Sequence, residues 1–218
     1  MNATTKQPTD HNPSAAKRHR GPAVSFFEPK TWAFWRALII AAMLCCFFGH
    51  WLEVPYCWLM DTAFGIVDSD YAAVTDPWYV PYRIYGYGAL AMTFVLEPLK
   101  ELIMRRRKTS HGALLEMTCL CVLLAMLLEL GFGMAINQPN AAGVYPYWDN
   151  SQLPLNVLGQ AWLINDFFIG LVAMVYLGFI FPMVCLAFKR LSPVAANITF
   201  ALLACGFAAC FIISLPYV

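Results

Sequence analysis

Long apolar blocks alternate with short polar segments along most of the chain. The blocks occupy residues 31–59, 84–104, 112–136, 160–188 and 194–215. A hydrocarbon core of about 30 Å is crossed by about 20 helical residues, and a spanning segment must satisfy its own backbone hydrogen bonds. The pattern therefore predicts an all-α integral membrane bundle of about five transmembrane helices. Pro55 is expected to end or kink the first helix.

The start of the chain has a different character. Residues 1–30 are polar and contain Pro, Ser, Lys and Arg, a composition typical of disordered segments. We predict a disordered cytoplasmic tail over 1–30 and a single transmembrane helical domain over 31–218. The first apolar block is expected to act as an uncleaved signal anchor.

Composition supports the membrane class. The chain is 60% hydrophobic and 12% charged, with a mean hydropathy of +0.59, whereas soluble domains carry roughly 25% charged residues. The net charge of +1 gives no reason to expect a nucleic-acid partner. The eight cysteines show no CxxC pair and no disulfide framework. They are expected to be packing residues.

The basic residues predict an orientation. They cluster before the first block, between the second and third, and between the fourth and fifth, and only Arg83 lies in a predicted outer loop. Short loops rich in Lys and Arg remain in the cytoplasm. The N-terminus is therefore predicted to be cytoplasmic and the C-terminus, ending at Val218, extracytoplasmic.

Polar side chains from four separate segments are predicted to share one depth. At a rise of about 1.5 Å per residue, Glu53 and Glu129 fall in the outer third of their helices, and Asn165 with Asp166 lies just inside the fourth. Intramembrane ionisable groups are costly and commonly functional. Arg83 is expected to pair with Glu53 or Glu129. A structural network, a substrate or ion site, and accidental agreement in depth all remain open.

Two acidic residues on the predicted cytoplasmic side have simpler explanations. Glu97 is three residues before Lys100, which favours a helix-end ion pair. Glu116 lies one turn into its helix, within reach of the basic cluster from Arg105 to Lys108. We interpret both as structural. The basic cluster itself is expected to set topology and contact anionic lipid heads.

The segment YWDNSQLPLNVLGQAWLIND, from Tyr147 to Asp166, is rich in turn-forming residues. We expect an ordered loop over 147–159 that covers the outer helix ends above Glu53 and Glu129. His50 and Glu53 share one helix face, but the other ligands of a metal pair are missing. No metal, cofactor or catalytic residue is expected, and no Ser-His-Asp set or P-loop is found in the sequence.

Four separated motifs carry a family resemblance. They are GHWLE (49–53), YRIYGYGAL (82–90), LLEL (127–130) and WDNSQLPLNVLGQAWLIND (148–166). The chain resembles the CmpB-type family of bacterial membrane proteins, labelled ABC-transporter type IV, over roughly residues 44–190. His50 separates the glycine and tryptophan of the first motif, Arg83 replaces a proline, and Asn150 replaces a tyrosine. The resemblance therefore does not support Arg83 as a site residue.

The resemblance implies a permease-like component in the bacterial plasma membrane, with a separate cytoplasmic ATPase subunit as partner. It marks Gly86 and Gly159 together with the residues expected to bind substrate. These are Glu53, Tyr85, Glu129, Trp148, Asp149, Ser151, Asn156 and Asn165.

Two other functions remain open. One is an enzyme at the membrane interface acting on lipid or cell-envelope precursors through acid–base catalysis, although no nucleophile is recognisable. The other is a structural or sensory membrane protein whose polar residues hold helices together. Membrane lipids are expected neighbours, and a second copy of the chain is a further candidate partner.

Overall fold

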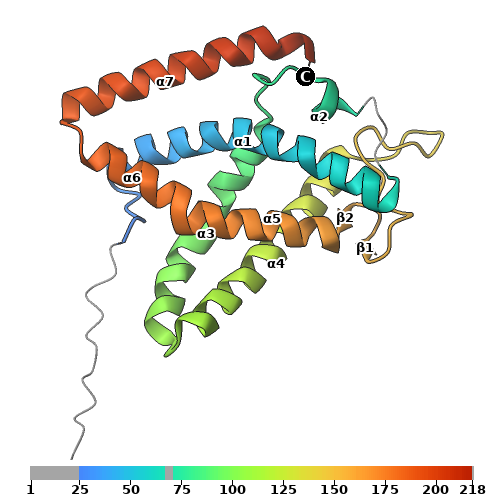
Figure 1. Cartoon of the computed structure of the whole chain (residues 1–218), viewed down its shortest axis with the longest axis horizontal. Helices are drawn as coiled ribbons and strands as arrows, with labels where there is room; N and C mark the ends of the chain where they lie inside the picture. Colours follow the sequence, from blue (N-terminus) through green and yellow to red (C-terminus); the bar gives the residue numbers. More distant parts are fainter. Residues whose placement is uncertain (1–24, 67–70, 218) are drawn as a thin grey trace, which may run out of the picture.

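The computed structural model describes residues 25–66 and 71–217 (Figure 1). The elements are α1 (Trp32–Phe64), α2 (Ala72–Thr75), α3 (Arg83–Arg106), α4 (Ser110–Ile136), β1 (Asn156–Val157), β2 (Ala161–Trp162), α5 (Leu163–Val175), the π-helical turn η1 (Tyr176–Ile180), α6 (Phe181–Lys189), α7 (Pro193–Ser214) and the 3₁₀ turn η2 (Leu215–Tyr217). This confirms the all-α class. The predicted disorder of residues 1–24 lies outside the described residues.

Within residues 25–66 and 71–217, four helical segments are long and apolar enough to cross a membrane. They are Trp32–Phe64, Ser110–Ile136, Leu163–Lys189 and Pro193–Tyr217. The predicted second span is helical as α3, but this helix is more polar, because it carries Glu97, Lys100 and Glu101 as well as basic residues at both ends. A fifth crossing through α3, and the orientation of the two termini, remain predictions.

Helix α1 is longer than the sequence pattern predicts. The Thr31 side chain accepts a hydrogen bond from the Phe34 N–H at 3.2 Å, and the helix continues through Pro55 to Phe64. The expectation that Pro55 could end this helix is wrong. Proline removes only one backbone donor, and the turn beyond it is anchored by the buried residues Cys57 and Met60.

Apolar side chains from α1, α3, α4 and the α5–α6 helix form most of the core. Leu38, Leu96, Leu177 and Phe181 are fully buried there. Helices α4 and α5 approach very closely, because a Cβ atom at Gly170 would lie 2.5 Å from Val122 Cγ2. Small residues at helix contacts commonly permit such packing inside membranes.

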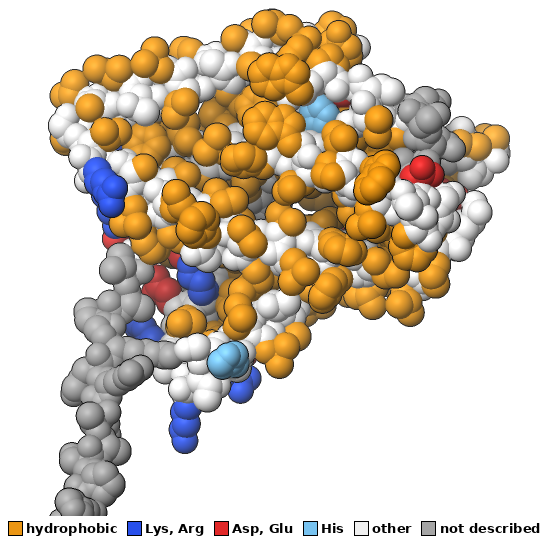
Figure 2. All heavy atoms as spheres, viewed as in Figure 1, with side chains coloured by type: hydrophobic (Ala, Val, Ile, Leu, Met, Phe, Trp, Pro, Cys, Tyr) orange, Lys and Arg blue, Asp and Glu red, His pale blue; other side chains and the backbone are white. Residues whose placement is uncertain are grey.

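Helix α7 lies at the edge of the bundle along α1 (Figure 1). Phe207 meets Phe47 at 5.7 Å between ring centroids, and Trp32 Nε1 donates to Asn197 Oδ1 at 3.1 Å. Most of the remaining α7 surface is exposed. Figure 2 shows hydrophobic side chains over most of the visible face, with basic side chains near the α6–α7 corner and the α3–α4 turn. This distribution suits a lipid-facing surface.

Helices α5 and α6 are joined without a break by η1, where the helix widens into one π-helical turn. The Phe181 N–H bonds to the Tyr176 carbonyl, an i to i−5 pattern. In this register the Leu177 carbonyl would face the nitrogen of Pro182, which has no hydrogen to donate. Lys100 of α3 supplies the missing bond, with Nζ 2.9 Å from Leu177 O. The π-turn is thus joined to α3 by a charged donor.

Candidate functional site

Glu53 forms the first polar cluster near the predicted outer end. Its carboxylate accepts hydrogen bonds from Tyr85 of α3 at 2.7 Å and from Tyr71, beside α2, at 3.1 Å. Gly49, one turn earlier in α1, leaves room for the Tyr85 ring, because a Cβ atom at this position would lie 2.0 Å from Tyr85 Cγ. The sequence pattern of α1 therefore brings a tyrosine hydroxyl to the acid.

His50 belongs to a neighbouring structural cluster. Its ring nitrogens contact the Val80 carbonyl at 2.9 Å and the Ala73 carbonyl at 3.2 Å, and its ring stacks on Tyr82 at 4.2 Å. Burial and the hydrogen bond from Tyr82 to Asp76 raise the pKa of Tyr82, so it remains a neutral donor. Over the described ranges, no group of three His, Cys, Asp or Glu side chains could hold a metal.

Glu129 of α4 forms the second acidic cluster. Its Oε1 accepts from Asn165 Nδ2 at 3.0 Å, and its Oε2 accepts from the backbone N–H of Trp162 at 3.2 Å. Asp166 lies beside Glu129 and is fully buried. Neither oxygen of Asp166 accepts a hydrogen bond from an N–H or O–H group of the described residues.

Tyr56 lies between the two acidic clusters. Its ring meets Phe168 of α5 at 5.7 Å, and its buried hydroxyl has no hydrogen-bond partner within residues 25–66 and 71–217. Glu53, Glu129 and Asp166 all lie within electrostatic range of this hydroxyl. The two clusters therefore belong to one polar region, with an uncommitted tyrosine donor at its centre.

Asn137 and Gln160 tie the 147–159 loop to the helix ends. Fully buried Asn137 donates to the Trp148 carbonyl at 2.7 Å and to Gln160 Oε1 at 3.0 Å. The Trp148 indole N–H donates to the Gln160 carbonyl at 2.7 Å. Trp148 is thus an anchor between the loop and the bundle.

The loop itself is built by short-range hydrogen bonds. Asp149 accepts from the Ser151 N–H at 2.9 Å, and the Ser151 hydroxyl and this N–H hold the pKa of Asp149 below its usual value. Asn156 donates to the Leu153 carbonyl at 2.7 Å and accepts from the Gly159 N–H at 2.9 Å. Positive φ angles at Leu158 and Gly159 form a tight turn between β1 and β2.

The structure brings together only part of the predicted set. Glu53 bonds to Tyr85, and Glu129 bonds to Asn165. The predicted pairing of Arg83 with Glu53 or Glu129 is wrong, because its guanidinium lies over the Phe211 ring at 5.4 Å. An exposed arginine gains a cation–π contact there without burial.

Sequence reasoning missed Tyr56, Tyr71, Asn137 and Gln160. Tyrosine is common throughout the interfacial segments, so it gave no distinct signal. Asn137 and Gln160 are polar residues immediately at the ends of apolar blocks, and this position was a signal available in the sequence.

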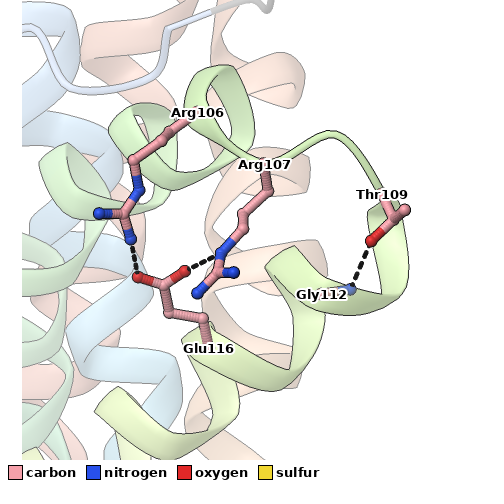
Figure 3. A network of polar contacts seen from close by, with 5 residues as sticks. All are labelled: Arg106, Arg107, Thr109, Gly112 and Glu116. Carbon is pink, nitrogen blue, oxygen red and sulfur yellow. Dashed lines mark hydrogen bonds and ion pairs between the residues drawn. The ribbon is translucent and has the colours of Figure 1, made fainter.

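The two ion pairs predicted at the opposite end are confirmed. Lys100 Nζ lies 2.6 Å from Glu97 Oε2. Glu116 contacts both Arg106 and Arg107, which closes the α3–α4 turn (Figure 3). Glu97 is fully buried, which the sequence interpretation of a helix-end pair did not anticipate.

Long apolar helices that carry polar clusters at their ends define a multi-pass membrane protein. The chain belongs to the family described as "Putative ABC-transporter type IV", whose model matches residues 40–215. The resemblance found in the sequence is thereby confirmed. No curated protein and no solved structure matches the chain. The matched range includes both acidic clusters and the 147–159 loop.

Proposed function

We propose that this protein is the permease component of a transporter in the bacterial plasma membrane, and that it binds solute in an outward-facing polar pocket beneath the 147–159 loop. The observation that carries the proposal is Asp166. Its fully buried carboxyl group receives no N–H donor from the described residues, and its polar neighbour is a second acid, Glu129. Burying two acidic groups together without a basic partner is costly. An incoming donor would repay that cost.

The polar balance of the region indicates the class of solute. Glu53, Glu129 and Asp166 supply acceptors, and Arg83, the basic residue predicted to pair with them, lies over Phe211 instead. Cationic groups bind carboxylates through charge-assisted hydrogen bonds and also favour aromatic faces. The proposed solute therefore carries an ammonium or guanidinium group.

Access to this region requires the loop to move. Asp166 is fully buried in the first turn of α5, and the loop is held in place by the hydrogen bonds of Trp148 and Asn137. Loops that cover sites commonly open on microsecond to millisecond timescales. In this proposal the Trp148–Gln160 and Asn137–Trp148 hydrogen bonds break when the loop opens and form again when it closes.

An uptake experiment tests the solute site. Cells expressing the wild type are compared with Asp166→Asn and Glu129→Gln across ammonium and guanidinium compounds and their neutral analogues. We expect uptake of at least one cation to fall by about tenfold or more, since a hydrogen bond to a charged group contributes about 1.5–3 kcal/mol. Asp61→Asn, at an exposed acid of α1 outside both acidic clusters, is the matched control. Unchanged cation uptake in both site variants, at equal membrane expression, would overturn the proposal.

Glu53→Gln separates transport from a purely structural role. If the acids only hold helices together, this variant lowers the thermal midpoint while uptake per folded molecule stays constant. The transport proposal instead requires uptake per folded molecule to fall. Quantifying detergent-extracted, monodisperse protein in each strain provides the necessary normalisation.

The α3–α4 turn is the proposed contact for a separate ATPase subunit. Residues 106–109 line an open hollow of about 450 Å³, and Glu116 fixes Arg106 and Arg107 within it. Lys108 has no ion pair among the described residues. Protein purified from its native membrane is expected to carry ATPase activity that Lys108→Gln reduces and Arg83→Gln preserves. Absence of ATPase activity from the wild-type preparation would contradict a stable complex.

A further inference from the structure

A second cavity lies far from the acidic clusters, where α1 begins, α6 ends and α7 begins. Its volume is about 180 Å³, which exceeds the share of a single water molecule, about 30 Å³. The lining includes Phe26, Phe34, Arg36, Phe188, Lys189 and Pro193. By the distribution of basic residues, this is the predicted cytoplasmic end of the bundle.

Arg36 is the unusual member of this lining. Its side chain is buried, with only 8% of the residue exposed, and its Nε atom has no hydrogen-bond partner in the described part of the chain. Nη1 donates to Asn197 Oδ1 at 2.5 Å, and the guanidinium lies 5.8 Å from the Phe188 ring centroid. Asn197 Oδ1 also accepts from Trp32, so this neutral acceptor is shared.

The charge of Arg36 is therefore not compensated by the described residues. No carboxylate of residues 25–66 or 71–217 forms an ion pair with it. A buried cation without a counter-charge is strongly disfavoured. A buried guanidinium that lines a cavity without a counter-charge among the described residues indicates that an anion belongs there.

Lys189 adds a second positive charge to the cavity. Its only ion-pair partner in the described residues is Glu28, at 3.9 Å, and both side chains are nearly half exposed. Such pairs contribute little. Helix α7 also begins at this cavity, at Pro193, and a helix N-terminus favours anions. With Arg36 and Lys189 against Glu28, the lining carries a net charge of +1.

We propose that this cavity binds a phosphate group, and that its source is the head group of an anionic phospholipid in the adjacent leaflet. The Arg36 guanidinium and Lys189 Nζ are the donors to the phosphate oxygens. Phe26, Phe34 and Phe188 provide apolar walls for the glycerol region. This site goes beyond the proposed transport function and is independent of it, since no residue of the acidic clusters takes part.

Lipid binding by the purified full-length protein tests the proposal. Native mass spectrometry and thermal unfolding are performed with phosphatidylglycerol, with phosphatidylcholine and with inorganic phosphate. We expect phosphatidylglycerol to bind about tenfold more tightly than phosphatidylcholine and to raise the thermal midpoint. Both lipids carry a phosphate, but the choline cation of phosphatidylcholine would be repelled by Arg36 and Lys189. Inorganic phosphate at millimolar concentration should reproduce little of this stabilisation.

Three variants locate the binding. Arg36→Gln and Lys189→Gln should each remove most of the preference for phosphatidylglycerol. Arg190→Gln should keep it, because Arg190 follows Lys189 directly but does not line the cavity. Lys189 is partly exposed, so its variant remains informative if Arg36→Gln fails to fold.

Three results would overturn the proposal. Equal binding of the two lipids by the wild type would exclude a site that selects a head group of net negative charge. If Lys189→Gln and Arg190→Gln lost the preference for phosphatidylglycerol equally, that preference would come from the general positive charge at this end of the bundle and not from the cavity. Full stabilisation by inorganic phosphate alone would overturn the lipid as the source and assign the site to a free anion.

Discussion

Tyr85 and Tyr71 hold the same carboxylate with unequal strength. The Tyr85 hydroxyl is 2.7 Å from Glu53 and half-buried, whereas the Tyr71 hydroxyl is 3.1 Å away and this residue is 40% exposed. A hydrogen bond to a charged group gains more free energy when water is excluded. The two tyrosines therefore permit a matched comparison at one acid.

We predict that Tyr85→Phe lowers the free energy of unfolding by about 1.5–3 kcal/mol, while Tyr71→Phe costs about 1 kcal/mol or less. Both variants remove one hydroxyl and keep the ring. Thermal or denaturant unfolding in one detergent provides the measurement. A larger loss for Tyr71→Phe would contradict the assigned order.

Leu158 is conformationally strained by its place in the β1–β2 turn. Its φ angle is +56°, and its side chain is 72% exposed. A non-glycine residue with a left-handed backbone costs of order 1 kcal/mol, and glycine relieves that cost. We predict that Leu158→Gly keeps or raises the thermal midpoint. Leu153→Gly, in the same loop without a positive φ angle, should lower it instead.

At the scale of elements, the sequence predicted the helices well but not their irregularities. The spans expected at 112–136 and 194–215 are α4 and α7 to within a few residues. Apolar blocks this long have few alternatives to a helix in lipid. The passage of α1 through Pro55 and the π-turn at Tyr176–Ile180 depend on tertiary partners such as Lys100, which local sequence does not reveal.

The α4–α5 contact supplies a prediction for element packing. Gly170→Ala places a Cβ atom 2.5 Å from Val122 Cγ2 and 2.8 Å from the Val122 backbone nitrogen. Backbone cannot yield as a side chain can, so we expect a loss of about 1–3 kcal/mol in unfolding free energy. Gly131→Ala in α4 is the control, because open space surrounds that position. Equal midpoints for the two variants would contradict the close approach.

At the scale of the whole molecule, the number of crossings determines where the C-terminus lies. If α3 crosses together with the four apolar segments, the two termini lie on opposite sides. We predict that a C-terminal alkaline phosphatase fusion is active and a C-terminal green fluorescent protein fusion is dark. The reverse result would place both termini in the cytoplasm and leave α3 as a helix that does not span.

The candidate site was predictable only in outline. Equal helical depth correctly brought Glu129 to Asn165, because depth follows from counting residues along a helix. The direction in which a side chain points around the helix axis does not follow from counting residues. That direction determines that Glu53 forms a hydrogen bond with a tyrosine and that Arg83 lies over Phe211. Arg36 was counted in the sequence only as a topology signal, although its burial makes it the least compensated cation described.

The π-turn carries one residue more than an α-helical turn, and Pro182 directly after it offers no N–H to a preceding carbonyl. Each residue turns a helix by about 100°. Removing one residue between Tyr176 and Ile180 would therefore rotate α5 about the helix axis relative to α6. If Phe181 stayed buried in the core, Asp166 would move away from Glu129. The extra residue thus lets one continuous helix present different faces to two different neighbours. It sets the rotation of α5 relative to α6.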